Sequence, residues 1–380
     1  MLIGVVAFVV AIVISVCLHE AGHMATAKAF GMKVTRYFLG FGPTLWSFRR
    51  GETEYGVKAI PAGGFVNIVG QTDLEEVPPE DADRAMVNKP GWQRFAVLGA
   101  GSFTHFVLAI IAFVAVFALY PVPSGQVKVV DVARCLGAKA GGHCQQTAPA
   151  YGELHAGDTV VAVDGTRLEG GPNQLSSIIQ QAHGEPVTLK MRRGGQAVTR
   201  TVDPREHDSR YIVGIHIAGT VEHLPPGAAV QRSFATFGQA IAQTGQALAA
   251  LPSHVGDMMP WNGGGSSKSR VVSVVGIGQL SGGAYAQSGL QGLLVVIAIF
   301  NIGIGIFNLL PLLPLDGGHM AVVVFERGRA LVYRLVRRPD PGRVDYNKLL
   351  PVTVVFLGLI VFVAVVALVN DIVNPVTASF

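Results

Sequence analysis

Two histidines and a glutamate stand close together within the first apolar segment of the chain. The motif is His19-Glu20-Ala21-Gly22-His23, which has the form H-E-x-x-H. On a helix, histidines four residues apart project from one face, so both imidazoles can bind one metal ion. Glu20 can reach a water on that metal and act as its general base. Because ionisable groups are expensive in an apolar segment, the motif predicts a functional zinc site rather than two core histidines.

A third metal ligand must come from another part of the chain, because a catalytic zinc ion takes three protein ligands and leaves one position for water. The run NLLPLLPLDGGH at 308–319 interrupts the third apolar stretch with prolines and glycines. Broken backbone at membrane depth persists only where it is buried in protein or lines a wet cavity. Asp316 and His319 both stand at this break, and both residue types bind zinc. The chemistry leaves both residues possible as the third zinc ligand and favours Asp316.

The composition indicates a membrane protein. The chain has 380 residues, of which 50% are hydrophobic and 14% charged. Four apolar stretches reach the roughly 20 residues needed to cross a bilayer. No basic residue precedes Lys28, so the first stretch lacks the positive region of a signal peptide. The net charge is only +4, and no basic run is interleaved with aromatic residues, so nucleic acid is not an expected partner.

Basic residues near the span ends predict the orientation in the membrane. They cluster after the first span and between the third and fourth spans, which marks these loops as cytoplasmic. The long segment between spans two and three then faces outward, and the zinc motif lies near the cytoplasmic leaflet. Cys135 and Cys144 fall close together in this outward segment, so we expect them to form a disulfide.

Three further patterns predict structure outside the spans. Apolar residues alternate on both sides of an Arg-Gly-Glu turn, which predicts a β-hairpin over 46–60. The stretch LHAGDTVVAVDG at 154–165 resembles PDZ domains of the bacterial protease-associated type, which bind extended peptides by strand addition. Apolar residues at helical spacing over 228–251 predict an amphipathic helix, which could lie on the outer membrane surface or pack on the PDZ module.

The two zinc-related motifs together resemble one known family. H-E-x-x-H in the first span and N-x-x-P-x-x-P-x-D-G in the third are similar to the site-2 proteases, and the single PDZ insertion is similar to their mycobacterial-type members. The likeness covers nearly the whole chain. It implies a Zn²⁺ cofactor held by His19, His23 and Asp316, with Glu20 as the general base. It also implies that Asn308 holds the substrate or stabilises the transition state.

The resemblance extends to a β-element that pairs with substrate. Residues 40–64 match this membrane-associated element, and we assign Tyr55 and Val57 to substrate binding. A substrate helix must unwind to expose its peptide bonds, and an edge strand of the 46–60 hairpin would stabilise the extended form. One position departs from the family: His105 stands where many members have an asparagine. We expect this histidine to be satisfied within the helices rather than to bind metal.

The family also implies what the enzyme would cut and where. Its substrates would be single-pass membrane proteins, such as anti-sigma factors already trimmed by an upstream site-1-type protease. The cut would release a cytosolic fragment in regulated intramembrane proteolysis. The protein would span a bacterial plasma membrane several times, in contact with its lipids and with the PDZ domain outside.

The sequence therefore predicts a polytopic α-helical membrane protein with four transmembrane helices, a membrane-associated β-hairpin and an extracytoplasmic α+β PDZ domain. The expected parts are, in order, a first span with the zinc motif at 1–30, a cytoplasmic-side loop with the hairpin at 31–91, a second span at 92–122, the PDZ domain at 125–218, the amphipathic helix at 228–260, a third span with Asp316 at 290–318, a cytoplasmic loop at 319–349 and a fourth span at 350–370.

Two other functions use some of the same features. A non-catalytic membrane scaffold could bind partners through its PDZ module, but it has no need of Glu20 and a complete ligand set. A metal transporter would need polar residues along its spans, and the fourth span has none beyond Thr353 between 352 and 369. The sequence thus favours the protease.

Overall fold

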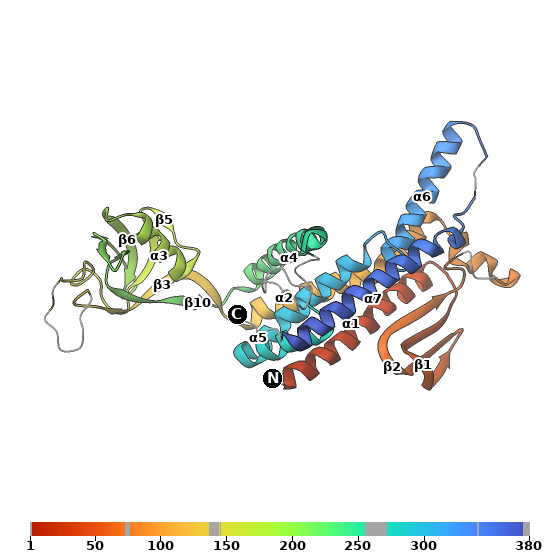
Figure 1. The fold of residues 1–380 in the computed structure, drawn as a ribbon, viewed down its shortest axis with the longest axis horizontal. Helices are drawn as coiled ribbons and strands as arrows, with labels where there is room; N and C mark the ends of the chain where they lie inside the picture. Colours follow the sequence, from red (N-terminus) through yellow and green to blue (C-terminus); the bar gives the residue numbers. More distant parts are fainter. Residues whose placement is uncertain are drawn as a thin grey trace. The chain divides into compact units, whose positions relative to one another are not determined.

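A computed structural model describes residues 2–72, 77–136, 144, 146–254, 272–339 and 342–374. The described chain contains four helices that are long and apolar enough to cross a membrane (Figure 1). They are α1 (Leu2–Ala29), α2 (Gly91–Leu119), α5 (Val274–Asn308) and α7 (Leu350–Val373). The chain divides into two compact units. One comprises residues 1–116 and 230–380, and the other comprises residues 117–229.

Small residues allow the apolar helices to approach one another closely. Within lipid, helices associate through packing rather than the hydrophobic effect, so small residues at contacts are favoured. A Cβ at Gly4 of α1 would stand 2.7 Å from Tyr285 Cβ of α5, and one at Gly22 would stand 2.6 Å from Thr104 Oγ1 of α2. Larger side chains fill the adjoining space, as where Phe8 meets Phe300 edge-on at 5.2 Å between ring centroids.

The third span, expected from residue 290, coincides with the part of α5 that follows a kink at Gly289. A preceding helical stretch, which the sequence did not predict, begins at Val274. The intervening stretch is rich in glycine and polar residues, which hid its helical character from an apolar count. Gly289 has φ of 58°, so α5 bends there in a conformation that glycine adopts readily.

A further helix occupies much of the stretch expected to be a cytoplasmic loop. Helix α6 (Asp316–Leu335) begins after the proline-containing break, so the expected parts at 290–318 and 319–349 divide differently from the prediction. A largely buried ion pair joins α6 to α2, with 2.8 Å between Arg94 and Glu326. Glu326 also accepts a hydrogen bond from the Val344 backbone N–H. The ion pair joins α6 to the helix bundle, and the second bond joins it to the segment that leads to α7.

The predicted hairpin is part of a larger, folded sheet. Strands β1 (Val34–Arg50) and β2 (Thr53–Ile68) are each long and bent, so they pair more than once. Residues 36–39 of β1 pair with 54–57 of β2 on one side and with 64–67 on the other. The remainder of β1, at 46–50, pairs with 53–57. The sheet therefore has four rows, each a stretch of β1 or β2, in the order 46–50, 53–57, 36–39 and 64–67.

The second unit is a small α+β domain. Its main sheet has the strand order β10-β3-β4-β6-β7, with β5 paired to β4, and α3 (Gly171–Gln181) packs on β3 and β10. The sheet extends slightly beyond the predicted 125–218 at both ends. The strands are β3 (Val122–Val132), β4 (Thr159–Val163), β5 (Thr166–Arg167), β6 (Val187–Arg193), β7 (Gln196–Val202), β8 (Arg205–His207), β9 (Arg210–Ile212) and β10 (Ile215–Glu222).

Alternating side chains build the core of this domain. Val187, Leu189 and Met191 on β6 are fully buried, as the period-two pattern of a strand with one covered face requires. Leu175 and Ile179 of α3 join the same core. The predicted disulfide between Cys135 and Cys144 is confirmed, with 5.5 Å between the two Cα atoms.

The amphipathic helix is present as α4 (Pro226–His254), and residues 255–260 of its predicted range lie outside the described part. Phe237 of α4 contacts Phe106 of α2, with ring centroids 5.9 Å apart. This part of α4 therefore contacts the membrane bundle. Short 3-10 helices complete the fold at Pro79–Arg84, Met86–Asn88 and Tyr346–Lys348.

Candidate metal centre

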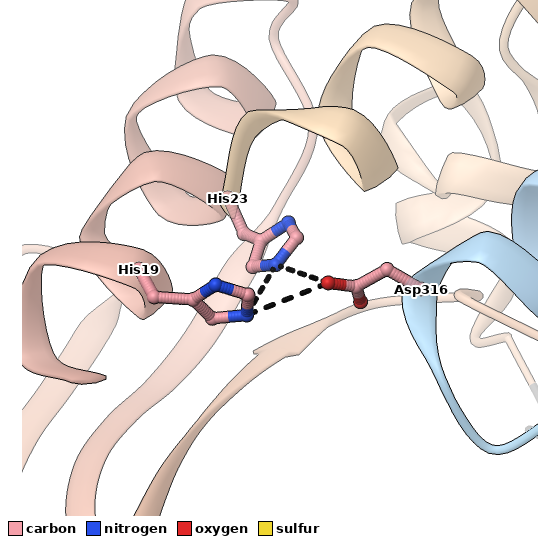
Figure 2. A group of neighbouring side chains, drawn as sticks. All are labelled: His19, His23 and Asp316. Atoms are coloured by element: carbon pink, nitrogen blue, oxygen red, sulfur yellow. Dashed lines mark hydrogen bonds and ion pairs between the residues drawn. The ribbon is translucent and has the colours of Figure 1, made fainter. Parts of the chain in front are cut away.

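Three side chains from opposite ends of the chain converge on one point (Figure 2). His19 and His23 project from one face of α1, and Asp316 is the first residue of α6. The two histidine Nε2 atoms are 3.2 Å apart. The Asp316 Oδ2 atom lies 3.4 Å from Nε2 of His19 and 3.3 Å from Nε2 of His23. Among the described residues, this is the cluster of histidine, cysteine and acidic side chains that could hold a metal ion.

The triangle of ligand atoms fits a zinc ion. Zinc binds nitrogen and carboxylate oxygen at about 2.0–2.1 Å with tetrahedral angles, so its ligand atoms stand about 3.3 Å from one another. All three separations here agree with that edge length. Asp316 Oδ2 is buried without a hydrogen-bond partner among the described residues. A buried acceptor needs a partner, and a cation at this point would supply one.

A backbone carbonyl sets the orientation of one ligand. The Nδ1 atom of His23 lies 2.7 Å from the carbonyl oxygen of Val97 on α2. Because that oxygen can only accept, Nδ1 carries the proton and Nε2 keeps a lone pair directed toward Asp316. Metal-binding histidines characteristically donate their second ring N–H in this way.

A glycine of α2 forms the floor of the site. A Cβ added at Gly101 would collide with the imidazole rings of both His19 and His23. The absence of a side chain therefore lets α2 pass directly beneath both ligands. The sequence prediction missed Gly101 and Val97 as parts of the site, because neither has a side chain that does chemistry.

Two glycines bring the acidic ligand into place. Gly317 packs against the Leu309 and Leu310 backbone, and Gly318 packs against the Leu312–Leu313 peptide. A Cβ at either position would collide with this backbone. The Asp-Gly-Gly sequence thus allows α6 to start in contact with the break that follows α5, and Asp316 faces α1 as a result.

His319, the rival ligand, lies elsewhere. Its Nδ1 atom is 3.2 Å from the Tyr346 hydroxyl, and the two rings stack with centroids 5.7 Å apart. It is not part of the cluster with His19 and His23. The structure therefore places Asp316, the favoured candidate, next to the two histidines.

Glu20 is positioned between the ligands and the sheet. It follows His19 on α1, close enough to interact electrostatically with both histidines and with Asp316. A Cβ at Gly64 of β2 would stand 3.1 Å from Glu20 Cγ, so the 64–67 row of the sheet passes directly beside this side chain. A general base in this place is adjacent both to the metal centre and to a strand.

A tyrosine attaches the sheet to α1. Tyr37 of β1 donates its hydroxyl to the Cys17 carbonyl oxygen at 2.6 Å. Burial raises the pKa of Tyr37 to about 12, so the hydroxyl stays protonated as a donor throughout the neutral range. This bond could not be predicted from the sequence, because its acceptor is a backbone carbonyl.

The residues predicted to bind substrate are dispersed. Asn308 is the last residue of α5, immediately before the break that leads to Asp316. Tyr55 pairs with both Tyr37 and Phe48, and Val57 pairs with both Leu39 and Trp46. The main chain at Tyr55 and Val57 therefore lies inside the sheet, whereas among the described strands none pairs with the outer side of the 64–67 row.

His105 is buried beside the metal centre. Only 1% of it is exposed, its Nδ1 lies 2.8 Å from Asn301 Oδ1, and its ring centroid is 4.9 Å from that of His19. As the sequence suggested, it is satisfied within the helices and stands outside the ligand cluster.

Comparison with known proteins gives a consistent result. The sequence profile described as peptidase family M50 matches residues 7–336. The zinc metalloprotease Rip1 of Mycobacterium tuberculosis is 38% identical over 98% of both chains. Rip1 of Mycolicibacterium smegmatis is 35% identical over 99% of this chain and 98% of its own length. A putative zinc metalloprotease of a Nostoc species is 27% identical over 95% of each chain.

Proposed function

The chain belongs to peptidase family M50, the site-2 proteases, and it is a zinc metalloprotease whose apolar helices make it an integral membrane protein. From this we propose that it cleaves the transmembrane segments of single-pass membrane proteins. The observation that carries this proposal is the place of the ligand triangle. His19 and His23 lie within the apolar helix α1, so the peptide bond has to reach them at membrane depth.

The residues that hold zinc would be His19, His23 and Asp316. When bound, the ion supplies a Lewis acid that activates water and polarises the substrate carbonyl. Glu20 accepts the proton of the attacking water and then delivers it to the leaving amine. Asn308, the last residue of α5, would hold the substrate main chain or stabilise the transition state.

A transmembrane helix conceals its carbonyl groups in hydrogen bonds, so it has to unwind before it can be cut. We place the strand that receives the extended substrate at residues 64–67 rather than at Tyr55 and Val57. The 64–67 row has a free outer side among the described strands, and Gly64 is in contact with Glu20. Main-chain pairing at this edge would lay the substrate next to the general base.

The α+β domain supports the PDZ assignment. Strand β10 is an edge strand, and α3 lies beside it. A cleft of about 690 Å³ runs between them, lined by residues that include Ile179, Val213 and Ile215. An edge strand beside a helix is the arrangement in which PDZ domains bind extended peptides. We propose that this groove takes the end of a trimmed ectodomain.

The substrates on this reading are proteins such as anti-sigma factors after a first cut by an upstream site-1-type protease. The membrane would be the bacterial plasma membrane, with the PDZ domain outside. The basic residues flanking α1 and α7 support that orientation. A purely non-catalytic scaffold is not favoured, because the ligand triangle and Glu20 are both in place.

The test is cleavage of a single-span substrate by the full-length protein in detergent, followed by mass spectrometry of the products. We expect a cut within the span, and we expect Glu20→Gln to keep zinc but lose cleavage, because the amide cannot accept a proton. Proteolysis by the Glu20→Gln protein, or cuts restricted to soluble loops, would contradict the proposal.

Single cysteines test the substrate edge. In a background without Cys17, a cysteine at Val66 should crosslink to a substrate cysteine in the Glu20→Gln protein, whereas one at Val57 should not. Both residues lie in β2, so the pair controls for general access to the sheet. Equal crosslinking at the two positions would show that the edge is misassigned.

A further inference from the structure

A buried polar pair joins two membrane helices next to the proposed zinc ligands. His105 of α2 and Asn301 of α5 are each only 1% exposed. The His105 Nδ1 atom lies 2.8 Å from Asn301 Oδ1, and Asn301 Nδ2 donates to the Ile297 carbonyl oxygen at 2.9 Å. Polar side chains are costly inside a membrane bundle, and such residues are retained where they serve a function.

The hydrogen bonds determine the state of this pair. Because Asn301 Nδ2 donates to a carbonyl, its Oδ1 is the atom that faces His105. His105 Nδ1 must therefore carry the proton and donate it. The asparagine is itself fixed by the α5 backbone, so the plane of the His105 imidazole has little freedom to turn.

The fixed imidazole lies against a metal ligand. The rings of His105 and His19 have centroids 4.9 Å apart and planes inclined by 38°. The His19 Nδ1 atom is buried without a hydrogen-bond partner among the described residues. His23 is held by the Val97 carbonyl, whereas the described contacts give His19 no equivalent bond. Ring contact with His105 is thus one restraint on how His19 is turned.

We propose that His105, held by Asn301, is a positioning residue for His19. The inference rests on the proposed zinc ligand set and deepens it. The pair connects α5, which leads through the break to Asp316, with the ring that braces His19. It thereby couples the placement of the acidic ligand to the placement of a histidine ligand from the other end of the chain.

The measurement is zinc affinity of the full-length detergent-purified protein, by competition with a chelator of known affinity. His105→Leu and Asn301→Leu should each lower the affinity about 10- to 100-fold, the usual loss for groups that orient metal ligands. Asn301→Asp keeps the oxygen acceptor for His105 but loses the amide donor to the Ile297 carbonyl, so its affinity should lie between that of the parent and that of Asn301→Leu. The double leucine variant should be no weaker than either single variant, because both substitutions break one connection.

Cobalt substitution separates positioning from direct binding. The His105→Leu protein loaded with Co²⁺ should keep the intense visible bands of a four-coordinate ion, with shifted positions. Loss of those bands would show that His105 is itself a ligand and would overturn the proposal. Parental zinc affinity in both leucine variants, or additive losses in the double variant, would overturn it as well.

Two further variants keep the outcome interpretable. Phe103→Leu changes a side chain of α2 that is 66% exposed, and it should leave zinc affinity unchanged. His23→Ala tests the ligand set itself and should abolish tight zinc binding. If His23→Ala retains zinc, the ligand set has failed; if it loses zinc while both leucine variants bind normally, only the positioning role has failed.

Discussion

Each of the two compact units has an aspartate with a buried carboxylate oxygen, and the two carboxylates have opposite surroundings. Asp158 of the PDZ-like domain is 1% exposed and accepts hydrogen bonds from the Arg193 guanidinium and from the His155 backbone N–H. Asp316 of the membrane bundle presents a buried Oδ2 that has no hydrogen-bond partner among the described residues. It faces two histidine nitrogens at 3.3 and 3.4 Å.

The difference separates a structural carboxylate from one that we propose binds zinc. Buried polar groups are nearly always hydrogen-bonded, so a completely paired carboxylate such as Asp158 has no remaining task. The Asp316 carboxylate instead lies at the ligand-to-ligand distance of a tetrahedral zinc site from two histidine nitrogens, so it still needs a cation as partner. The same residue type therefore has different roles in the two units, and substitutions should have different consequences.

The largest expected effect comes from Asp316. Asp316→Asn removes the anionic ligand and should lower zinc affinity by at least about 100-fold and cleavage by more, because the metal then has two strong protein ligands. Metal analysis after dialysis measures the first quantity. His319→Ala is the matched control in the next turn of α6 and should keep its zinc. The reverse result would exchange the roles of Asp316 and His319.

A smaller loss is expected from the floor of the site. Gly101→Ala would place a Cβ against both histidine rings, so we expect zinc affinity to fall about 10- to 100-fold. Gly99→Ala is the control on the same helix, since its Cβ would meet only Met320 Cε at an ordinary 3.6 Å. Similar zinc affinities for the two alanine variants would contradict the role given to Gly101.

Breaking the pair in the other unit should change stability and not metal binding. Arg193→Leu leaves the Asp158 carboxylate buried without its cation, which should cost about 3 kcal/mol of unfolding free energy in that domain. Denaturant unfolding followed by hydrogen exchange in residues 117–229 measures it. Zinc content should remain that of the parent protein. A loss of zinc would show that the stability of the α+β domain affects the metal centre of the other unit.

The same pair predicts a pH dependence. The hydrogen bond from Arg193 holds the pKa of Asp158 below its ordinary value. A carboxylate with a lowered folded pKa contributes stability above its unfolded pKa of about 3.9, and this stability is lost as pH falls through the folded pKa. Acid unfolding of the domain should be shallower in Asp158→Asn than in the parent. Equal slopes would exclude Asp158 as the titrating group.

The smallest effect concerns the disulfide. Reducing Cys135–Cys144 opens a short loop, so we expect a loss of about 2 kcal/mol in the stability of the domain. Thermal unfolding with and without reductant measures it, and the Cys135→Ser/Cys144→Ser variant should not respond to reductant. An unchanged unfolding temperature would show that the bridge contributes little.

Groups with their own chemistry could be predicted from the sequence, and groups that act through their backbone could not. His19, His23 and the favoured Asp316 meet as expected, because helical spacing fixes the first two and a broken span indicated the third. The Val97 carbonyl and the empty space at Gly101 carry no chemical signature. Their roles depend on which helix passes beneath α1, and only the fold determines that.

The sheet shows a second limit of local pattern. Alternation around the turn correctly indicated a hairpin at 46–60, and we expected this hairpin to offer an edge strand to substrate. Residues 36–39 pair with 54–57, so the row that contains Tyr55 and Val57 lies inside the sheet. Such a pairing between distant rows is decided by how a long strand bends, and period-two alternation does not report it. Local pattern also missed the helical stretch of α5 before Gly289, since its glycines and polar residues hid it from an apolar count.

The convergence of His19, His23 and Asp316 also has a consequence for biosynthesis. Almost 300 residues separate the two ends of this ligand set, and the ribosome makes the histidines first. The emerging polypeptide has no complete metal site until α5 and the start of α6 have joined the earlier helices. On the proposed ligand set we therefore expect a prematurely terminated chain that lacks α6 to be inert, with proteolytic capacity acquired only when the membrane bundle is nearly finished.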